Sequence, residues 1–227
     1  MLEIIPGILE KEWSEIERKI ELVKPFAKTE SNSAAAIHID IIDGKFAPNT
    51  TFLDPKPFAK YTNPSTGSGL FFEVHMMVEE PIQYLKPFAD AGFKRFLGHI
   101  EKMSDQVEFV VQGELLGEVG LAIDGPTSLE SVKVPLDDLD AILIMTIKAG
   151  FAGQVFVPEY LKKIEILLPT SRDQNDIVVE VDGGVNDKTI VQACNAGATR
   201  FVANSFLFKT NDVSNNYQIL EEKVKRL

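Results

Sequence analysis

Residues 37–49 read IHIDIIDGKFAPN, and the first half of this stretch has the pattern of a buried strand. Every second residue from Ile37 is an isoleucine, which is the period that places side chains on one face of a sheet. His38 and Asp40 therefore point to the opposite face, just before an Asp-Gly turn. Because burying a carboxylate without a partner is energetically expensive, the sequence predicts a partner for Asp40 on this second face.

The composition is that of a globular protein with a substantial core. The chain has 227 residues, 44% of them hydrophobic and 25% charged, which is within the range of one large α/β barrel. The net charge of -11 and the lack of a basic run argue against nucleic acid and anionic membranes as partners. No apolar run is long enough to span a bilayer, and the start MLEIIPGILEKEW lacks the features of a signal peptide. The single Cys194 fits a reducing cytosol, so we expect a cytoplasmic protein.

Strand-like and helix-like segments alternate along the whole chain. The strand-like segments are residues 2–9, 34–41, 70–77, 94–100, 117–123, 141–147, 177–181 and 200–203. The helix-like segments are residues 13–23, 54–61, 81–89, 106–112 with Ser104 as its cap, a short helix from Ser128, and residues 159–168, 187–196 and 217–226. About eight β/α units without an interdomain linker predict a single (β/α)₈ TIM barrel over residues 1–227. A doubly wound open sheet is the alternative, but such sheets usually stop near six strands.

Polar side chains follow three of the predicted strands to their carboxyl ends, where barrels of this kind carry their active sites. His38 and Asp40 come from the first of these strands, His75 from FFEVHMM and Asp182 from VVEVDGG. Two imidazoles and two carboxylates converging on the barrel axis predict a site for one divalent metal ion; zinc, iron, manganese and cobalt all suit these donors. A lone strand-end histidine is more often structural, as we expect for His99, but the conjunction of four such residues favours a metal site.

The alternation of faces extends to the neighbours of these residues. Residues predicted to face the helices are Phe72, Val74, Met76, Val179 and Val181, and residues predicted to face the axis are Glu73, His75, Met77, Glu180 and Asp182. A lone inward aspartate could instead pair with a lysine or cap a following helix, so the prediction depends on the whole set.

Three glycine-rich or polar turns after the last strands suggest a phosphate site. They are GFAGQ at residues 150–154, DGG at residues 182–184, and the pair Asn204-Ser205. Glycines let the backbone approach an anion closely, and barrels often bind phosphate through the loops after their last strands. Tight turns would require the same glycines, so GFAGQ alone does not decide between the two interpretations.

Five motifs, in order, resemble those of the ribulose-phosphate 3-epimerase family: IHIDIIDGKFAPN, EVHMMVEEP, LIMTIKAGFAGQVFVPE, VEVDGGVN and FVANS. The resemblance spans nearly the whole chain and implies a metal-dependent (β/α)₈ barrel of the ribulose-phosphate-binding type, with ligands at His38, Asp40, His75 and Asp182. It also implies a homo-oligomeric enzyme of carbohydrate metabolism that acts in the pentose phosphate pathway.

The chemistry implied by this resemblance is epimerisation at C3 of a ketose phosphate, foremost D-ribulose 5-phosphate to D-xylulose 5-phosphate. Asp40 and Asp182 would act as base and acid on opposite faces of the substrate, while the cation stabilises the enediolate charge. Met77 and Met145 align with methionines that line the family's site, although core packing would explain them equally well. The implied substrate-binding residues are Gly7, His75, Met77, Met145, Gly150, Phe151, Ala152, Gly153, Gly183, Gly184, Asn204 and Ser205.

Several positions depart from the family pattern and leave the substrate open. Gly7 replaces a serine, Ile42 a methionine, Lys45 a histidine, Asp124 an asparagine, Asn204 a glycine, and Lys148-Ala149 an acidic or amide residue followed by proline. A hexulose phosphate such as allulose 6-phosphate is an alternative substrate, because GFAGQ with Ala152 resembles the loop of those relatives. A lyase or decarboxylase would carry an Asp-x-Lys arrangement, which HIDIID lacks. A non-catalytic sugar-phosphate binder is the remaining alternative.

Overall fold

Eight parallel strands close into a barrel in which each strand pairs with the next and β1 pairs with β8. The structure, a computed structural model, describes residues 2–27, 36–63, 65, 69–167 and 177–225. The strands are β1 (Glu3–Ile8), β2 (Ile37–Ile42), β3 (Phe72–Met77), β4 (Arg95–His99), β5 (Glu118–Ile123), β6 (Ala141–Met145), β7 (Val178–Asp182) and β8 (Arg200–Ala203). The predicted (β/α)₈ TIM barrel is confirmed, and the open-sheet alternative is wrong because the pairing of β1 with β8 leaves no sheet edge.

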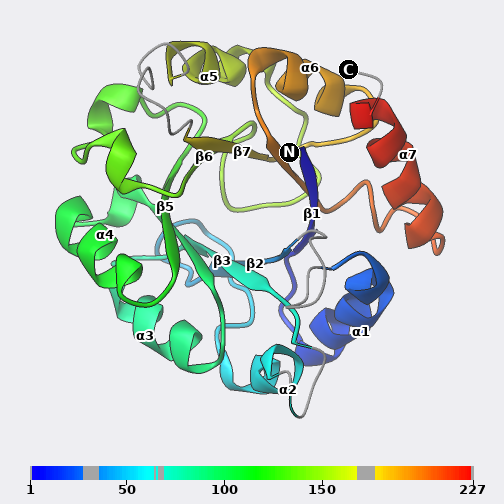
Figure 1. Cartoon of the computed structure of the whole chain (residues 1–227), viewed down its shortest axis with the longest axis horizontal. Helices are drawn as coiled ribbons and strands as arrows, with labels where there is room; N and C mark the ends of the chain where they lie inside the picture. Colours follow the sequence, from blue (N-terminus) through cyan, green and yellow to red (C-terminus); the bar gives the residue numbers. More distant parts are fainter. Residues whose placement is uncertain (1, 28–35, 64, 66–68, 168–176, 226–227) are drawn as a thin grey trace.

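The helices form a ring outside the strands (Figure 1). Those among the described residues are α1 (Trp13–Val23), α2 (Ala59–Thr62), α3 (Ile82–Asp90), α4 (Gln106–Glu114), α5 (Lys162–Leu167), α6 (Thr189–Ala196) and α7 (Val213–Lys225). Within the described ranges, no helix has both the length and the apolar character needed to cross a membrane.

Several helix predictions need correction. The segment predicted as a helix over residues 54–61 is a 3₁₀ turn, Lys56–Phe58, followed by α2, and α7 begins at Val213 rather than at residue 217. The helix predicted from Ser128 is a 3₁₀ turn, Leu129–Ser131, and a second 3₁₀ turn at Leu136–Asp138 completes the connection from β5 to β6. The cap of α4 is Asp105 rather than Ser104, because the Asp105 carboxylate accepts the backbone N–H of Glu108 at 2.9 Å. Parts of three predicted elements, residues 34–35, 168 and 226, lie outside the described residues.

The side chains of the strands alternate between two separate apolar layers, as predicted. The residues that face the helices include Ile37, Ile39, Ile41, Phe72, Val74, Met76, Val179 and Val181, which are buried together with the apolar faces of the helices. A second apolar cluster fills the barrel interior and includes Ile42, Met77, Leu97, Leu143 and Met145. Each buried aliphatic side chain stabilises the fold by about 1.5–3 kcal/mol. This part of the interior is lined by apolar side chains, so the buried polar residues beside it need partners.

Candidate active site

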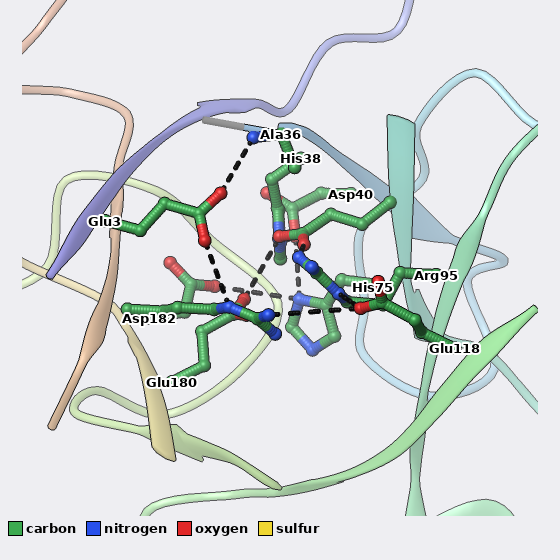
Figure 2. Close-up of polar contacts among 11 residues, drawn as sticks. Glu3, Ala36, His38, Asp40, His75, Arg95, Glu118, Glu180 and Asp182 are labelled. Carbon is green, nitrogen blue, oxygen red and sulfur yellow. Dashed lines mark hydrogen bonds and ion pairs between the residues drawn. The ribbon is translucent and has the colours of Figure 1, made fainter. Parts of the chain in front are cut away.

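Four polar side chains from three strands meet inside the barrel (Figure 2). His38 and Asp40 come from β2, His75 from β3, and Asp182 is the last residue of β7. Nδ1 of His75 lies 2.8 Å from Oδ1 of Asp40, and Nε2 of His38 lies 3.2 Å from the same oxygen. Oδ2 of Asp182 lies 3.6 Å from Nδ1 of His75. We call these residues the four-residue cluster; one donor atom from each lies within 4.8 Å of the other three.

Strand register explains why residues far apart in sequence meet here. Asp40 and His75 are direct partners in the pairing of β2 with β3, so their inward side chains share one level of the barrel. Both histidines are fully buried, while the Asp182 side chain retains 13% of its exposure. The histidines are therefore shielded from solvent, and access to the cluster lies on the side of the two carboxyl groups.

The pKa values of the two carboxyl groups of the cluster are shifted in opposite directions. Burial opposes ionisation of Asp40, but the charge of His38 and hydrogen bonds from both imidazoles hold its pKa well below the usual range. Burial and the nearby negative charge of Asp40 raise the pKa of Asp182 to about 8. Two adjacent carboxyl groups whose environments separate their pKa values are the arrangement that general acid–base catalysis uses.

The pKa values of the two imidazoles are also shifted in opposite directions. Burial would lower the pKa of His38, yet the charge of Asp40 and hydrogen bonds to neighbouring carboxylates raise it well above its usual value. Burial lowers the pKa of His75 to about 4, so this ring stays neutral, and a neutral imidazole nitrogen can ligate a metal.

The donor set fits one divalent transition-metal ion. Two imidazole nitrogens and two carboxylate oxygens lie within 4.8 Å of one another. Burial and then the charge of Asp40 raise the pKa of Asp182, and a bound cation would favour its ionised form. Zinc, iron, manganese and cobalt all accept such mixed nitrogen and oxygen donors. Metal ligation by these four residues remains a prediction that the geometry favours.

A cavity opens directly above the cluster. Its lining includes ten of the predicted substrate-binding residues: Met77, Met145, Gly150, Phe151, Ala152, Gly153, Gly183, Gly184, Asn204 and Ser205. Asp40 and Asp182 also line it, so both candidate catalytic carboxyl groups face the same space. Two predicted substrate-binding residues do not line this cavity: His75 is buried beneath it, and Gly7 packs against Val202, where an added Cβ would lie 2.7 Å from Cγ1.

The glycines of the predicted phosphate loops have positive φ angles, so both interpretations of these turns are compatible with the structure. Gly183 has φ 114° and Gly184 has φ 68°, values that L side chains rarely adopt. A Cβ on Gly184 would also lie 2.9 Å from the backbone nitrogen of Phe156, so this turn needs glycine for its shape. An added Cβ on Gly153 would meet nothing within 4 Å, which is the open backbone that an anion could approach.

Comparison with known proteins identifies the family. A sequence profile described as the ribulose-phosphate 3 epimerase family matches residues 3–208. The chain belongs to the ribulose-phosphate 3-epimerase family. It is 33% identical over 195 residues to the ribulose-phosphate 3-epimerase of Chlamydia muridarum, covering 84% of both chains. It is 31% identical over 217 residues to that of Bacillus subtilis, covering 93% of this chain and 94% of the other.

Solved structures share the barrel at much lower sequence identity. KGPDC from Streptococcus mutans superposes with a TM-score of 0.69 at 11% identity, covering 100% of this chain and 99% of that one. The 3-hexulose-6-phosphate synthase from Salmonella typhimurium gives a TM-score of 0.67 at 11% identity, covering 99% of both chains. These similarities show the fold alone.

The departures from the epimerase family pattern have definite places in the structure. Ile42 packs inside the barrel beside Met77, and the exposed Lys45 forms an ion pair with Glu79 at 2.7 Å. Asp124 accepts the backbone N–H of Ala149 at 2.7 Å and so ties the loop after β5 to the loop after β6. Lys148 is exposed and lines a neighbouring cavity of about 290 Å³ rather than the one above the cluster.

His99 fits the structural role expected for it. Its Nδ1 lies 2.8 Å from Glu101, and its ring packs against Phe46 at 4.6 Å and His75 at 4.9 Å between centroids. Two groups of side chains among the described residues could hold a metal ion, and His99 belongs to neither.

The sequence pattern did not identify the residues that contact the cluster from below. Glu73 lies 2.7 Å from Nδ1 of His38, and the buried Arg95 forms an ion pair with Glu73. Glu180 is fully buried, 3.5 Å from the same nitrogen of His38. Glu73 and Glu180 each precede a predicted metal ligand by two residues and were predicted to face the axis, so the period-two pattern carried a signal for them. Arg95 needed the register of β3 with β4, which pairs it with Glu73.

Proposed function

We propose that the protein epimerises C3 of D-ribulose 5-phosphate to give D-xylulose 5-phosphate, as an isomerase that requires one divalent metal ion. The observation that carries the proposal is the pair Asp40 and Asp182, two carboxyl groups with opposite pKa shifts that line one cavity. Family membership supports the substrate, since the curated relatives are named ribulose-phosphate 3-epimerase.

The proposed reaction moves one proton off C3 and another onto its opposite face. Asp40 comes from β2 and Asp182 from β7, and both line the cavity, so one carboxylate can accept the proton while the other, as a carboxylic acid, donates one. The reverse reaction exchanges the two roles. A divalent ion held by His38, Asp40, His75 and Asp182 would supply positive charge where the enediolate oxygens develop negative charge.

Other residues of the cavity would position the substrate and keep water away. Met77 and Met145 offer apolar, polarizable side chains at the level of the carboxyl groups, and both are buried. The backbone of residues 150–153, Gly183-Gly184 and Asn204-Ser205 would bind the phosphate, with Phe151 and Ala152 covering it. Gly7 and His75 would act from beneath the cavity lining.

Cytoplasmic location and homo-oligomeric assembly are also part of the proposal. The single cysteine supports the first, and resemblance to the family motifs supports the second. Size-exclusion chromatography with light scattering tests the assembly, because a monomeric mass would contradict it.

The central test is deuterium exchange at C3. Protein loaded with Mn²⁺, Zn²⁺, Fe²⁺ or Co²⁺ is incubated in heavy water with ribulose 5-phosphate or allulose 6-phosphate, and wash-in is followed by NMR. We expect rapid exchange at C3 with ribulose 5-phosphate, and loss of exchange in Asp40→Asn and in Asp182→Asn. The exposed Asp138→Asn in the turn after β5 is a matched control that should keep full exchange.

Each outcome of this test separates the candidate functions. Preferential exchange with allulose 6-phosphate would move the assignment to the hexulose phosphate, which Ala152 in the loop of residues 150–154 favoured from sequence. Binding of either sugar phosphate without any exchange would leave a non-catalytic binder and overturn the proposal.

A further inference from the structure

A chain of ion pairs continues from the four-residue cluster to the floor of the barrel (Figure 2). Its members alternate in charge and come from five different strands. In order from the cluster they are Glu73, Arg95, Glu118, Arg200 and Glu3. We call this set the ion-pair chain. We propose that its first pair, Glu73 and Arg95, positions His38 by holding the proton on Nδ1, so that Nε2 faces the cluster as a metal ligand.

The contact between Glu73 and His38 carries the first step. Oε1 of Glu73 lies 2.7 Å from Nδ1 of His38, and both side chains are fully buried. An ionised carboxylate can only accept, so this hydrogen bond requires the proton on Nδ1. Nε2 lies 3.2 Å from Oδ1 of Asp40, and with Nδ1 carrying the proton of a neutral ring, Nε2 would offer its lone pair to a cation in place of this hydrogen bond. A ligating histidine commonly gives its second N–H to a carboxylate, which fixes the ring and increases its basicity.

Arg95 ensures that Glu73 meets His38 as a carboxylate. Its Nη1 donates to Oε2 of Glu73, and its Nε donates to Glu118 at 2.7 Å. The fully buried carboxylate of Glu73 therefore lies between the guanidinium of Arg95 and the imidazole of His38. The guanidinium keeps its charge at any ordinary pH, so it keeps Glu73 charged.

The rest of the ion-pair chain connects this pair to β5, β8 and β1. Arg200 lies 3.9 Å from Glu118 and 3.1 Å from Glu3, across the seam where β8 meets β1. Glu3 accepts the backbone N–H of Ala36, the residue directly before β2, at 3.0 Å. The strand that carries His38 is therefore held at its start by one end of the ion-pair chain and at its histidine by the other.

A second cation between His38, Glu73 and Glu180 is the competing interpretation. Their donor atoms lie within 4.8 Å of one another, and within the described part of the chain the carboxylate of Glu180 has no hydrogen-bond partner, its nearest nitrogen being Nδ1 of His38 at 3.5 Å. Arg95 argues against it, because its positive charge already lies against Glu73, where a second cation would have to bind. The proposal therefore requires one metal ion per chain.

The inference relies on the proposed function only in taking His38 as a metal ligand, and the test is designed to separate the two. Metal-free protein is titrated with Co²⁺ in competition with a chromophoric chelator, and the visible spectrum of bound Co²⁺ reports its coordination. We expect one Co²⁺ per wild-type chain, and Glu73→Gln should bind it about 10–100-fold more weakly with an altered spectrum. Glu10→Gln, which breaks the partly buried ion pair with Lys19 outside the cluster, should bind it like the wild type.

A second measurement does not depend on any variant remaining folded. Long-range ¹H–¹⁵N NMR of the Zn²⁺-loaded wild type should show His38 protonated at Nδ1 and not at Nε2. A proton on Nε2, two Co²⁺ ions per chain, or equal affinity in Glu73→Gln and wild type would each overturn the inference. If the wild type fails to bind Co²⁺, both the inference and the metal-dependent function are overturned. If Glu73→Gln binds Co²⁺ with wild-type affinity and still exchanges C3, the inference alone is overturned.

Discussion

The four-residue cluster and the ion-pair chain lie inside the same barrel, yet their charges are balanced in different ways. In the ion-pair chain every carboxylate faces a guanidinium, and Arg95 and Glu73 are almost completely removed from water. In the cluster two buried carboxyl groups lie beside the same imidazoles, and their pKa values are shifted in opposite directions: His38 lowers that of Asp40, while burial and the charge of Asp40 raise that of Asp182. Paired charges hold the strands of the barrel in place, whereas an incompletely balanced set of charges can bind a cation and exchange protons.

The largest effect is expected when a carboxylate is removed from the four-residue cluster. Asp182→Asn should lower kcat by about 10²–10⁴-fold, because it removes the proposed proton donor. The same change should leave the stability of metal-free protein nearly unchanged near neutral pH, since Asn and a protonated Asp182 are both uncharged beside Asp40. Turnover and chemical denaturation of the same preparation check both parts. Normal turnover would show that Asp182 has no role in proton transfer.

The opposite result is expected in the ion-pair chain. Arg95→Met should reduce the free energy of unfolding by about 3–5 kcal/mol, because it leaves Glu73 charged and buried without its main partner. Urea denaturation monitored by circular dichroism measures the change. A loss below about 1 kcal/mol would mean that this buried pair does not stabilise the fold more than an exposed one.

Metal removal should expose a pH dependence that belongs to the cluster alone. Asp182 has a folded pKa of about 8 against an ordinary value of 3.8, so the folded state retains a proton that the unfolded chain has lost between these values. Its contribution to stability is therefore complete below about pH 4 and is lost as the pH rises toward 8. Chelator-treated wild type should lose up to about 2 kcal/mol relative to Asp182→Asn between about pH 6 and pH 8.

Thermal denaturation across this pH range, with and without added metal, provides the measurement. Bound metal should abolish the difference, because a cation favours the ionised form of Asp182. Parallel pH profiles of the two metal-free proteins would show that the proton is not retained in the folded state.

The smallest effect is expected at the far end of the ion-pair chain. Glu3→Gln should reduce stability by about 1 kcal/mol or less, because Glu3 and Arg200 are partly exposed and water screens their interaction. Its Co²⁺ affinity should change much less than that of Glu73→Gln. A larger loss of affinity at Glu3 than at Glu73 would place the main control of His38 at the start of β2 instead.

Much of the site could be predicted because local periodicity constrains it. The alternation in IHIDIID places His38 and Asp40 on the interior face, and FFEVHMM does the same for His75. Parallel strands of a closed barrel end at one rim, so side chains from separate motifs were expected to meet there, and the structure brings these residues to within a few ångströms of one another. The cap of α4 was misplaced by one residue because Ser104 and Asp105 are both good capping residues, and only the backbone geometry selects Asp105.

The sequence by itself determined the barrel, its interior face and the residues that gather at its carboxyl rim, because these depend on a period of two repeated in strand after strand. The tertiary structure was needed to show that Arg95 pairs with Glu73, that burial beside Asp40 raises the pKa of Asp182, and that Gly7 packs against Val202. The physical reason is that charge balance depends on distance and burial. Both quantities are set by strand register and barrel closure, which no local pattern contains.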